Sequence, residues 1–273
     1  MMLNLKIIGQ GRTADIFEYE EGKIIKLFKQ EFPEDAINQE FLVSKFVHSL
    51  GIKIPQPFEL TQLDSRFGIV FERMSGTTLL HEMTSKPWLI NKQSRKLARL
   101  QYELHCHPAH DAVEELRYQK SVLVDNIQLA PLLTEDEKEQ IKSYLKGLPD
   151  DNKLCHGDFH PDNVLIGSNS CIIDWMTGMI GNPAGDVART VILLSFGTLP
   201  NETCRTVKLL ISYLRNRIKT AYLKQYLKLT GREFKEIDRW ILPVAAARLI
   251  ECIPDEEKRK LIVIIRKRLQ AIS

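Results

Sequence analysis

LCHGDFHPDNVLI, residues 154–166, packs two histidines, two aspartates and one asparagine into eight positions before it turns apolar. The stretch ends within a short apolar run, NVLIG at residues 163–167. A second run, CIIDW at residues 171–175, follows after SNS. Runs of this length around a short polar connection predict a β-hairpin. A polar loop therefore lies directly in front of a hairpin that can hold its side chains in place.

The polar residues follow the spacing H-x-D-x-x-x-x-N, with His156, Asp158 and Asn163, and Asp174 comes eleven residues later. This is the spacing of the catalytic loop of kinases. In that loop the first aspartate accepts or orients the proton of an attacking hydroxyl, while the asparagine and the later aspartate bind Mg²⁺ on a triphosphate. The pattern predicts Asp158 as the catalytic base and Asn163 and Asp174 as catalytic metal ligands.

Two other interpretations of the loop exist. His156, Asp158 and His160 alternate along the chain and are ligand types of a metal-dependent hydrolase. A polar loop without chemistry is the other. The kinase interpretation makes further demands, namely a glycine-rich turn, a lysine on the third strand and a glutamate on the next helix, in that order.

The first seventy residues alternate short apolar runs with turns. LKIIG, DIFEYE, KIIKLF and FGIVFER have the length and composition of strands, and EEGK is a turn between the second and third. A helix is expected over residues 33–52, because Pro33 and two acids open it and Gly51 closes it.

The three demands are met in this part of the sequence. GQGRTADIF supplies Gly9, Gly11 and Ala14, whose small size lets backbone amides approach a phosphate. Lys26 lies within an apolar strand, where a buried ammonium group needs an anionic partner. Glu40 is the expected partner, because it lies in the middle of the helix rather than at its start.

At this point the chain resembles the aminoglycoside phosphotransferase and choline kinase-like family of small-molecule kinases, across essentially its full length. The resemblance rests on HGDFHPDNVLI followed by IIDW, and no A-P-E segment of protein kinases follows. It implies an α+β, two-lobed protein kinase-like fold, with a small N-terminal β-sheet lobe carrying one helix and a large, mainly helical C-terminal lobe. It also implies ATP and Mg²⁺ as cofactors and a small-molecule hydroxyl as acceptor.

The resemblance assigns further roles. FERMSGTTL resembles the hinge, so backbone groups of Glu72 and Met74 are expected to meet adenine. GNPAGDVAR resembles a segment whose aspartate, here Asp186, braces the catalytic loop through backbone hydrogen bonds. Two departures concern the acceptor side: Asn182 replaces the usual aspartate of that segment, and two uncharged residues follow Trp175 where many members carry an acid.

The chain changes character after Met74. Long amphipathic helices are expected over residues 91–105, 111–128, 134–147, 203–229, 233–252 and 255–271. The boundary is expected near RMSGTT, with residues 1–74 as the nucleotide-binding lobe and residues 75–273 as the catalytic and acceptor-binding lobe.

Composition narrows the class of protein. The 273 residues are 44% hydrophobic and 27% charged, and no leader pattern or long apolar run is found, so we expect neither secretion nor a membrane span. Five scattered cysteines fit free thiols in a cytoplasmic protein. Residues 201–273 hold 17 Lys and Arg against 8 Asp and Glu. These bases lie on solvated faces of expected helices, so nucleic-acid binding is not expected.

The basic C-terminal part also bears on the acceptor. A polycationic aminoglycoside would need a concentration of carboxylates there. We therefore expect a neutral or singly charged metabolite, such as a sugar or an amino alcohol. The oligomeric state is left open.

Three signals have competing interpretations. HCHPAH, with His105, His107 and His110, is either a metal cluster or a helix end, and the helix end is favoured. Arg248 and Glu251 form either a local salt bridge, which is favoured, or part of the acceptor pocket. A catalytically silent nucleotide-binding module is the rival to an enzyme, but the residues whose loss would indicate it are present.

Overall fold

The computed structural model describes residues 5–109, 116–167, 170–197 and 204–272. Contacts between Cα atoms divide the chain into two compact units. The first comprises Met1–Glu82, Glu114–Leu116 and Pro161–Gly178; the second comprises Met83–Val113, Arg117–His160 and Met179–Ser273. The sequence suggests a nucleotide-binding lobe over residues 1–74 and a catalytic and acceptor-binding lobe over residues 75–273. This division stays a prediction, because it is defined by the molecules that each lobe binds.

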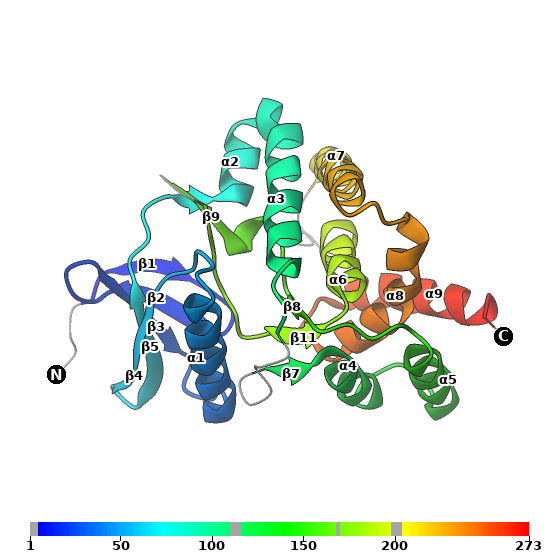
Figure 1. The fold of residues 1–273 in the computed structure, drawn as a ribbon, viewed down its shortest axis with the longest axis horizontal. Coiled ribbons are helices and arrows are strands. Elements are labelled where there is room, and N and C mark those ends of the chain that lie inside the picture. The colour runs from blue at the N-terminus through cyan, green and yellow to red at the C-terminus, as the bar shows by residue number, and fades with distance from the viewer. Residues whose placement is uncertain (1–4, 110–115, 168–169, 198–203, 273) are drawn as a thin grey trace. The chain divides into compact units, whose positions relative to one another are not determined.

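The first unit contains an antiparallel sheet of five strands in the order β1-β2-β3-β5-β4 (Figure 1). The strands are β1 (Ile7–Gln10), β2 (Ala14–Glu18), β3 (Lys23–Phe28), β4 (Pro57–Leu63) and β5 (Arg66–Glu72). All but β4 were expected. β4 lies at the sheet edge and is largely exposed, so its sequence PFELTQL lacks the apolar run that marks a buried strand.

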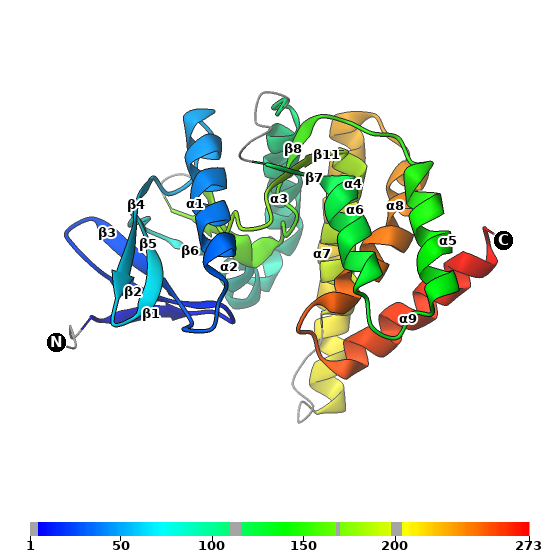
Figure 2. The ribbon, with the colours of Figure 1, turned by 90° about the horizontal axis from the view of Figure 1, so that it is seen from below.

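Helix α1 (Glu34–Ser49) packs against β4 and β5 of this sheet (Figures 1 and 2). Glu34 and Asp35 occupy its first turn, where acids suit the exposed amides, and Gly51 follows its end at a φ of 75°. Ile37 of α1 packs with Phe28 of β3 in one apolar cluster. Because alternate residues of a strand share a face, Lys26 lies on the side of the sheet that α1 covers.

A second, smaller sheet completes the first unit. β9 (Val164–Ile166) and β10 (Ser170–Ile172) pair antiparallel, as expected, and β6 (Thr77–Thr78) adds to β9. The expected turn between them falls partly on residues 168–169, outside the described residues. Gly76 serves this sheet by close approach, since a Cβ there would lie 2.3 Å from the Ile166 carbonyl oxygen.

The second unit is mainly helical. Its elements are α3 (Ile90–His105), α4 (Gln119–Gln128), α5 (Glu135–Lys146), α6 (Pro183–Phe196), α7 (Arg205–Thr230), α8 (Phe234–Ala247) and α9 (Asp255–Gln270), with β7 (Arg117–Tyr118), β8 (Lys153–Cys155) and β11 (Met179–Gly181) as a small sheet. The short helix α2 (Leu79–Ser85) precedes them. α3 lies along α7, and α8 packs against α4, α5, α6 and α9 (Figure 2).

Helix α2 was not expected, and the helices differ from expectation in three further places. The helix expected over 111–128 is confined to α4, because residues 117–118 pair with β11 as a strand; residues 110–115 lie outside the described residues. The helix expected over 233–252 gives way at Ala247 to a 3₁₀ turn. α6 was not expected, because it is buried on nearly every side and so lacks an amphipathic pattern.

The α+β class expected from the sequence is confirmed, with a sheet and one helix in the first unit and a mainly helical second unit. None of the helices in the described ranges combines the length and the apolar composition needed to cross a bilayer.

Candidate active site

Lys26 forms the ion pair with Glu40 that the sequence predicts. Lys26 Nζ donates to Glu40 Oε1 at 2.6 Å, and both side chains are largely buried. Burial alone would lower the pKa of Lys26, but the carboxylates of Glu40 and Asp174 outweigh it and raise the pKa above its usual range. Lys26 is therefore held as a cation inside the first unit.

Asp174 is the second partner of Lys26, which the sequence does not reveal. Lys26 Nζ donates to Asp174 Oδ1 at 2.8 Å, and the Asp174 side chain is 43% exposed. The Asp174 backbone has a φ of 66°, a left-handed conformation that is unusual for a residue other than glycine. Such strain is characteristic of residues held in place by a functional site.

The hairpin brings Asn163 to the same end as Asp174. Val164 pairs with Ile172 in the β9–β10 register, and the Ile173 backbone N–H donates to the Asn163 carbonyl at 3.0 Å. Asn163 immediately precedes the hairpin and Asp174 closely follows it, so the paired strands bring the two residues to the same end. This pairing is the physical reason for their spacing in the sequence.

The glycine-rich segment forms the tight turn between β1 and β2. The Gly11 backbone N–H donates to the Ala14 carbonyl at 2.8 Å, and a Cβ on Gly11 would lie 3.0 Å from that same oxygen. At Gly9 a Cβ would meet Ile16 at 3.4 Å. Neither glycine has a left-handed φ. The turn therefore favours glycine at Gly11 for lack of space, whereas the contact that a side chain would make at Gly9 is an ordinary one.

The expected hinge follows β5. The Glu72 backbone N–H donates to the Gln56 carbonyl and the Arg73 N–H to the Gly22 carbonyl. Met74 makes no hydrogen bond to any residue in the described ranges. Of the two expected hinge residues, Met74 is thus the one whose backbone groups are not used by the fold.

Asp158 lies in the second unit, in the turn after β8. Gly157 adopts a φ of 76°, and the Asp158 backbone N–H donates to His156 Nδ1 at 3.2 Å. The His156 ring is fully buried and packs edge-on against Phe159. His156 therefore supports the shape of the turn that presents Asp158.

Arg189 of α6 contacts the Asp158 carboxylate, a contact that the sequence does not reveal. Arg189 Nη2 lies 2.9 Å from Asp158 Oδ1, and His160 Nε2 lies 3.4 Å from Asp158 Oδ2. Burial alone would raise the pKa of Asp158, but His160 and Arg189 outweigh it and hold the pKa well below its usual range. Asp158 is therefore ionised throughout the neutral range.

Asp186 braces this turn, as the resemblance implies. Its Oδ1 accepts the Gly157 N–H at 2.7 Å, and its Oδ2 accepts the His156 N–H at 3.2 Å, Gln101 Nε2 at 2.9 Å and His105 Nε2 at 3.0 Å. Burial tends to raise the pKa of Asp186, but these donors, His105 above all, lower it.

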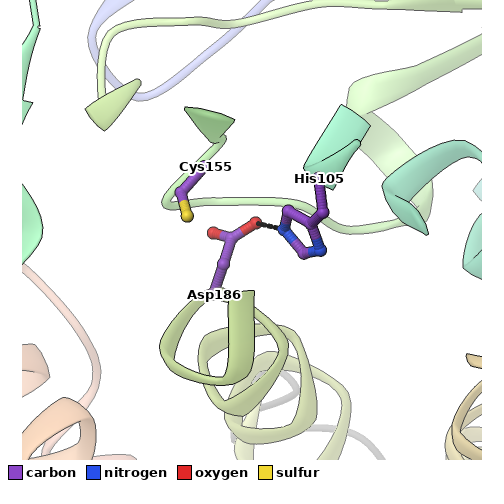
Figure 3. Close-up of side chains that lie close together, drawn as sticks. All are labelled: His105, Cys155 and Asp186. Carbon is purple, nitrogen blue, oxygen red and sulfur yellow. Dashed lines mark hydrogen bonds and ion pairs between the residues drawn. The ribbon is translucent and has the colours of Figure 1, made fainter. Parts of the chain in front are cut away.

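His105, Cys155 and Asp186 bring their side-chain ligand atoms within 4.8 Å of one another in the second unit (Figure 3). Both nitrogens of His105 are already used, by Asp186 and by the Tyr226 hydroxyl at 2.7 Å. Burial raises the pKa of the Cys155 thiol well above its usual range, which disfavours the thiolate that a metal would require. The cluster is a hydrogen-bonded brace.

The other metal interpretations fare no better among the described residues. His156, Asp158 and His160 are not among the groups whose ligand atoms converge there. In HCHPAH, His107 Nδ1 lies 3.0 Å from the Glu103 carbonyl at the end of α3, so the helix-end interpretation holds for His107. His110 lies outside the described residues.

Known proteins resemble this chain in sequence and in structure. A model described as the phosphotransferase enzyme family matches residues 4–210. A search of curated proteins found no match. Among solved structures, the aminoglycoside phosphotransferase APH(4)-Ia aligns with 98% of this chain and 92% of its own, at 13% identity and a TM-score of 0.64.

Two further structures are similar. A thermostable mutant of APH(4)-Ia in a ternary complex with AMP-PNP and hygromycin B aligns with 98% of this chain and 92% of its own, at 12% identity and a TM-score of 0.61. The macrolide 2'-phosphotransferase MphH from Brachybacterium faecium aligns with 98% of this chain and 89% of its own, at 14% identity and a TM-score of 0.53. At such identities the likeness shows the kinase-like fold.

The family model covers well over half of the sequence, including the loop of Asp158, the β9–β10 hairpin and the Lys26–Glu40 pair. The chain belongs to the phosphotransferase enzyme family.

Proposed function

We propose that this phosphotransferase moves the γ-phosphoryl group of Mg-ATP to a hydroxyl group of a small molecule. The observation that carries the proposal is the double contact of Lys26, which is bonded to Glu40 of α1 and to Asp174 behind the hairpin. Kinases depend on a lysine–glutamate ion pair of this kind and on an aspartate that holds Mg²⁺.

Nucleotide binding is assigned to the first unit. The β1–β2 turn leaves little room for a side chain at Gly11 and carries a second small residue at Gly9, which suits the close approach of phosphate oxygens to backbone amides. Lys26 would contact the phosphates, with Glu40 holding it in place. Met74, whose backbone groups have no hydrogen-bond partner in the described ranges, and Glu72 would meet the adenine.

The residues at the end of the hairpin fit a magnesium ion. Asn163 and Asp174 offer an amide oxygen and a carboxylate, the hard donors that Mg²⁺ prefers, and the Asp174 side chain is partly exposed. When bound there, Mg²⁺ would supply positive charge that offsets the charge of the phosphates. Lys26 already bonds Asp174 and would keep its carboxylate oriented.

Asp158 is assigned to the acceptor. Because Arg189 and His160 hold its pKa well below the usual range, Asp158 would act chiefly by accepting a hydrogen bond and so orienting the attacking hydroxyl. Asp186 would keep the turn that carries Asp158 in shape through the backbone of Gly157.

The class of acceptor is proposed to be a neutral or singly charged metabolite. APH(4)-Ia and MphH are named for aminoglycoside and macrolide acceptors, so small molecules with hydroxyl groups fit this fold. In the present chain, residues 201–273 carry an excess of bases, which disfavours a polycation. Residues 1–74 are proposed to bind the nucleotide, and residues 75–273 the acceptor.

A coupled assay of ADP release, run with sugars, amino alcohols and antibiotics, tests the proposal. We expect acceptor-dependent ADP release that requires Mg²⁺ and is abolished in Asp158→Ala. Tight ATP binding without turnover on any acceptor class would instead identify a catalytically silent nucleotide-binding module and overturn the proposal.

A further inference from the structure

Arg189 joins two carboxylates that come from distant parts of the second unit. Its Nη2 donates to Asp158 Oδ1 at 2.9 Å and to Glu251 Oε2 at 3.0 Å, and its Nη1 donates to Glu251 Oε1. The Arg189 side chain is 13% exposed. A planar guanidinium held by one carboxylate on two nitrogens has a fixed direction, so its contact with Asp158 is fixed as well.

Glu251 is in turn held from behind. Arg248 Nη1 donates to Glu251 Oε2 at 2.7 Å, and Arg248 also bonds Glu257 in the first turn of α9, through Nη2 at 2.7 Å. The side chains of Arg248 and Glu257 are 5% and 2% exposed. Five charges of alternating sign therefore run from a buried anchor on α9 to Asp158.

The arrangement is more than a stability device. Arg189 Nε is buried and has no hydrogen-bond partner in the described ranges, and a buried donor left unpaired is costly. The guanidinium thus points its two Nη atoms at the carboxylates and leaves its Nε–H without a hydrogen bond in the described ranges. The charge at the outer end of the network is Asp158, whose side chain is 24% exposed and which the proposed function places at the acceptor hydroxyl.

We propose that Arg189 is a positioning residue for phosphoryl transfer, which fixes the Asp158 carboxylate toward the acceptor hydroxyl, and that Glu251 aims Arg189. This inference rests on the proposed function, because it assigns Asp158 to the acceptor. Arg189 Nη2 bonds Asp158 Oδ1 at 2.9 Å, and His160 Nε2 lies 3.4 Å from Asp158 Oδ2, so each carboxylate oxygen has a cationic or polar neighbour that fixes its direction.

The pH dependence of turnover is a readout that a merely structural role would not move. Among the residues that the structure describes, Arg189 and His160 lie against the Asp158 carboxylate, and Glu251 lies behind Arg189. Without Arg189, Asp158 and Glu251 would face each other as two carboxylates without the cation between them, which raises the pKa of an aspartate. Arg189→Met should then lose activity on the acid side at a higher pH than the wild type does.

The test compares Arg189→Met, Arg189→Lys and Glu251→Gln with the wild type. We expect kcat to fall about 100-fold in Arg189→Met, the effect of a misplaced catalytic group, while KM for ATP stays within about twofold. Millimolar guanidinium should restore part of the turnover of Arg189→Met. Arg189→Lys should retain intermediate activity, because it keeps the charge but not the fork.

Arg268→Met is the matched control. It breaks another arginine–carboxylate pair of the second unit, that with Asp238, and should leave kcat, the pH profile and the response to guanidinium unchanged. If Arg189→Met does not fold, Glu251→Gln carries the same test, with a smaller fall in kcat and the same shift of the acid limb.

An NMR titration of the ¹³C-labelled Asp158 carboxyl separates the two proposals, because it needs no turnover. A higher pKa of Asp158 in Arg189→Met would support the positioning contact even if every acceptor failed, in which case the proposed function alone would fall. Wild-type kcat in Arg189→Met, with an unchanged titration of Asp158, would overturn the role of Arg189.

Discussion

The Asp186 carboxylate accepts the Gly157 backbone N–H at 2.7 Å, which ties helix α6 to the turn that presents Asp158. Gly157 sits at a φ of 76°, which glycine adopts without strain, so this hydrogen bond selects one of the several conformations open to that residue. The residue next to the proposed acceptor-orienting carboxylate is thus held by a charge 29 positions along the chain.

Asp186→Asn should lower the free energy of unfolding by about 2 kcal/mol. In the described part of the chain, the groups that bond the Asp186 carboxylate are donors, so the amide NH₂ of asparagine must face one of them wherever it points. Urea unfolding measures the change. Asp238→Asn, which alters a half-exposed pair with Arg268, is the control and should cost less than about 1 kcal/mol.

The stability of the wild type should also depend on pH through Asp186. Its pKa is lower in the folded chain than in the unfolded chain, so the unfolded chain binds the proton first as the pH falls. The contribution of Asp186 is therefore complete above about pH 4 and is lost at lower pH. Urea midpoints between pH 6 and pH 3 should fall less steeply in Asp186→Asn, and equal slopes would count against the brace.

Lys26→Met should destabilise the first unit by about 3 kcal/mol, because it leaves the buried Glu40 carboxylate without its cation. Adding Glu40→Gln should recover part of that loss, since the uncompensated charge is then gone. Thermal and urea unfolding of both single variants and the double variant give the coupling energy. Additive effects would mean that the pair contributes nothing.

Asp158→Ala and Asp174→Ala should separate chemistry from binding. Asp158→Ala should abolish transfer and leave nucleotide affinity nearly intact, because Asp158 is assigned to the acceptor side. Asp174→Ala should weaken Mg-ATP binding itself, since it removes a hard ligand. Calorimetric titration with Mg-AMP-PNP and the ADP-release assay measure the two effects. Near wild-type turnover in a folded Asp158→Ala would end the assignment of Asp158.

Neutral sugars or amino alcohols should be better acceptors than kanamycin-type polycations. The expectation rests on the 17 bases and 8 acids of residues 201–273, since like charges disfavour association. Steady-state kinetics over matched panels will decide it. Saturable phosphorylation of kanamycin-type compounds at micromolar KM, without better activity on neutral acceptors, would show that the net charge is a poor guide to the pocket.

The sequence by itself determined the α+β class, most strands of the first sheet, the hairpin and the pairing of Lys26 with Glu40. These follow from short-range patterns: apolar alternation, turn residues, and the need of a buried ammonium for an anionic partner. The proximity of Asn163 and Asp174 could also be predicted from the sequence, because a hairpin brings the residue before its first strand close to the residues that follow its second strand. The α6 helix could not be predicted, because a helix that is buried on nearly all sides has no amphipathic pattern.

Only the tertiary structure decided which charges meet across long stretches of chain. Lys26 and Asp174 are 148 residues apart, and Arg189 and Glu251 are 62 apart. The sequence predicted a local salt bridge between Arg248 and Glu251, which the 2.7 Å contact confirms. It did not predict that Arg189 connects this pair to Asp158. No periodicity encodes such pairs, because they arise when packed helices and loops bring side chains together, and the arginine beside Asp158 is set by that packing alone.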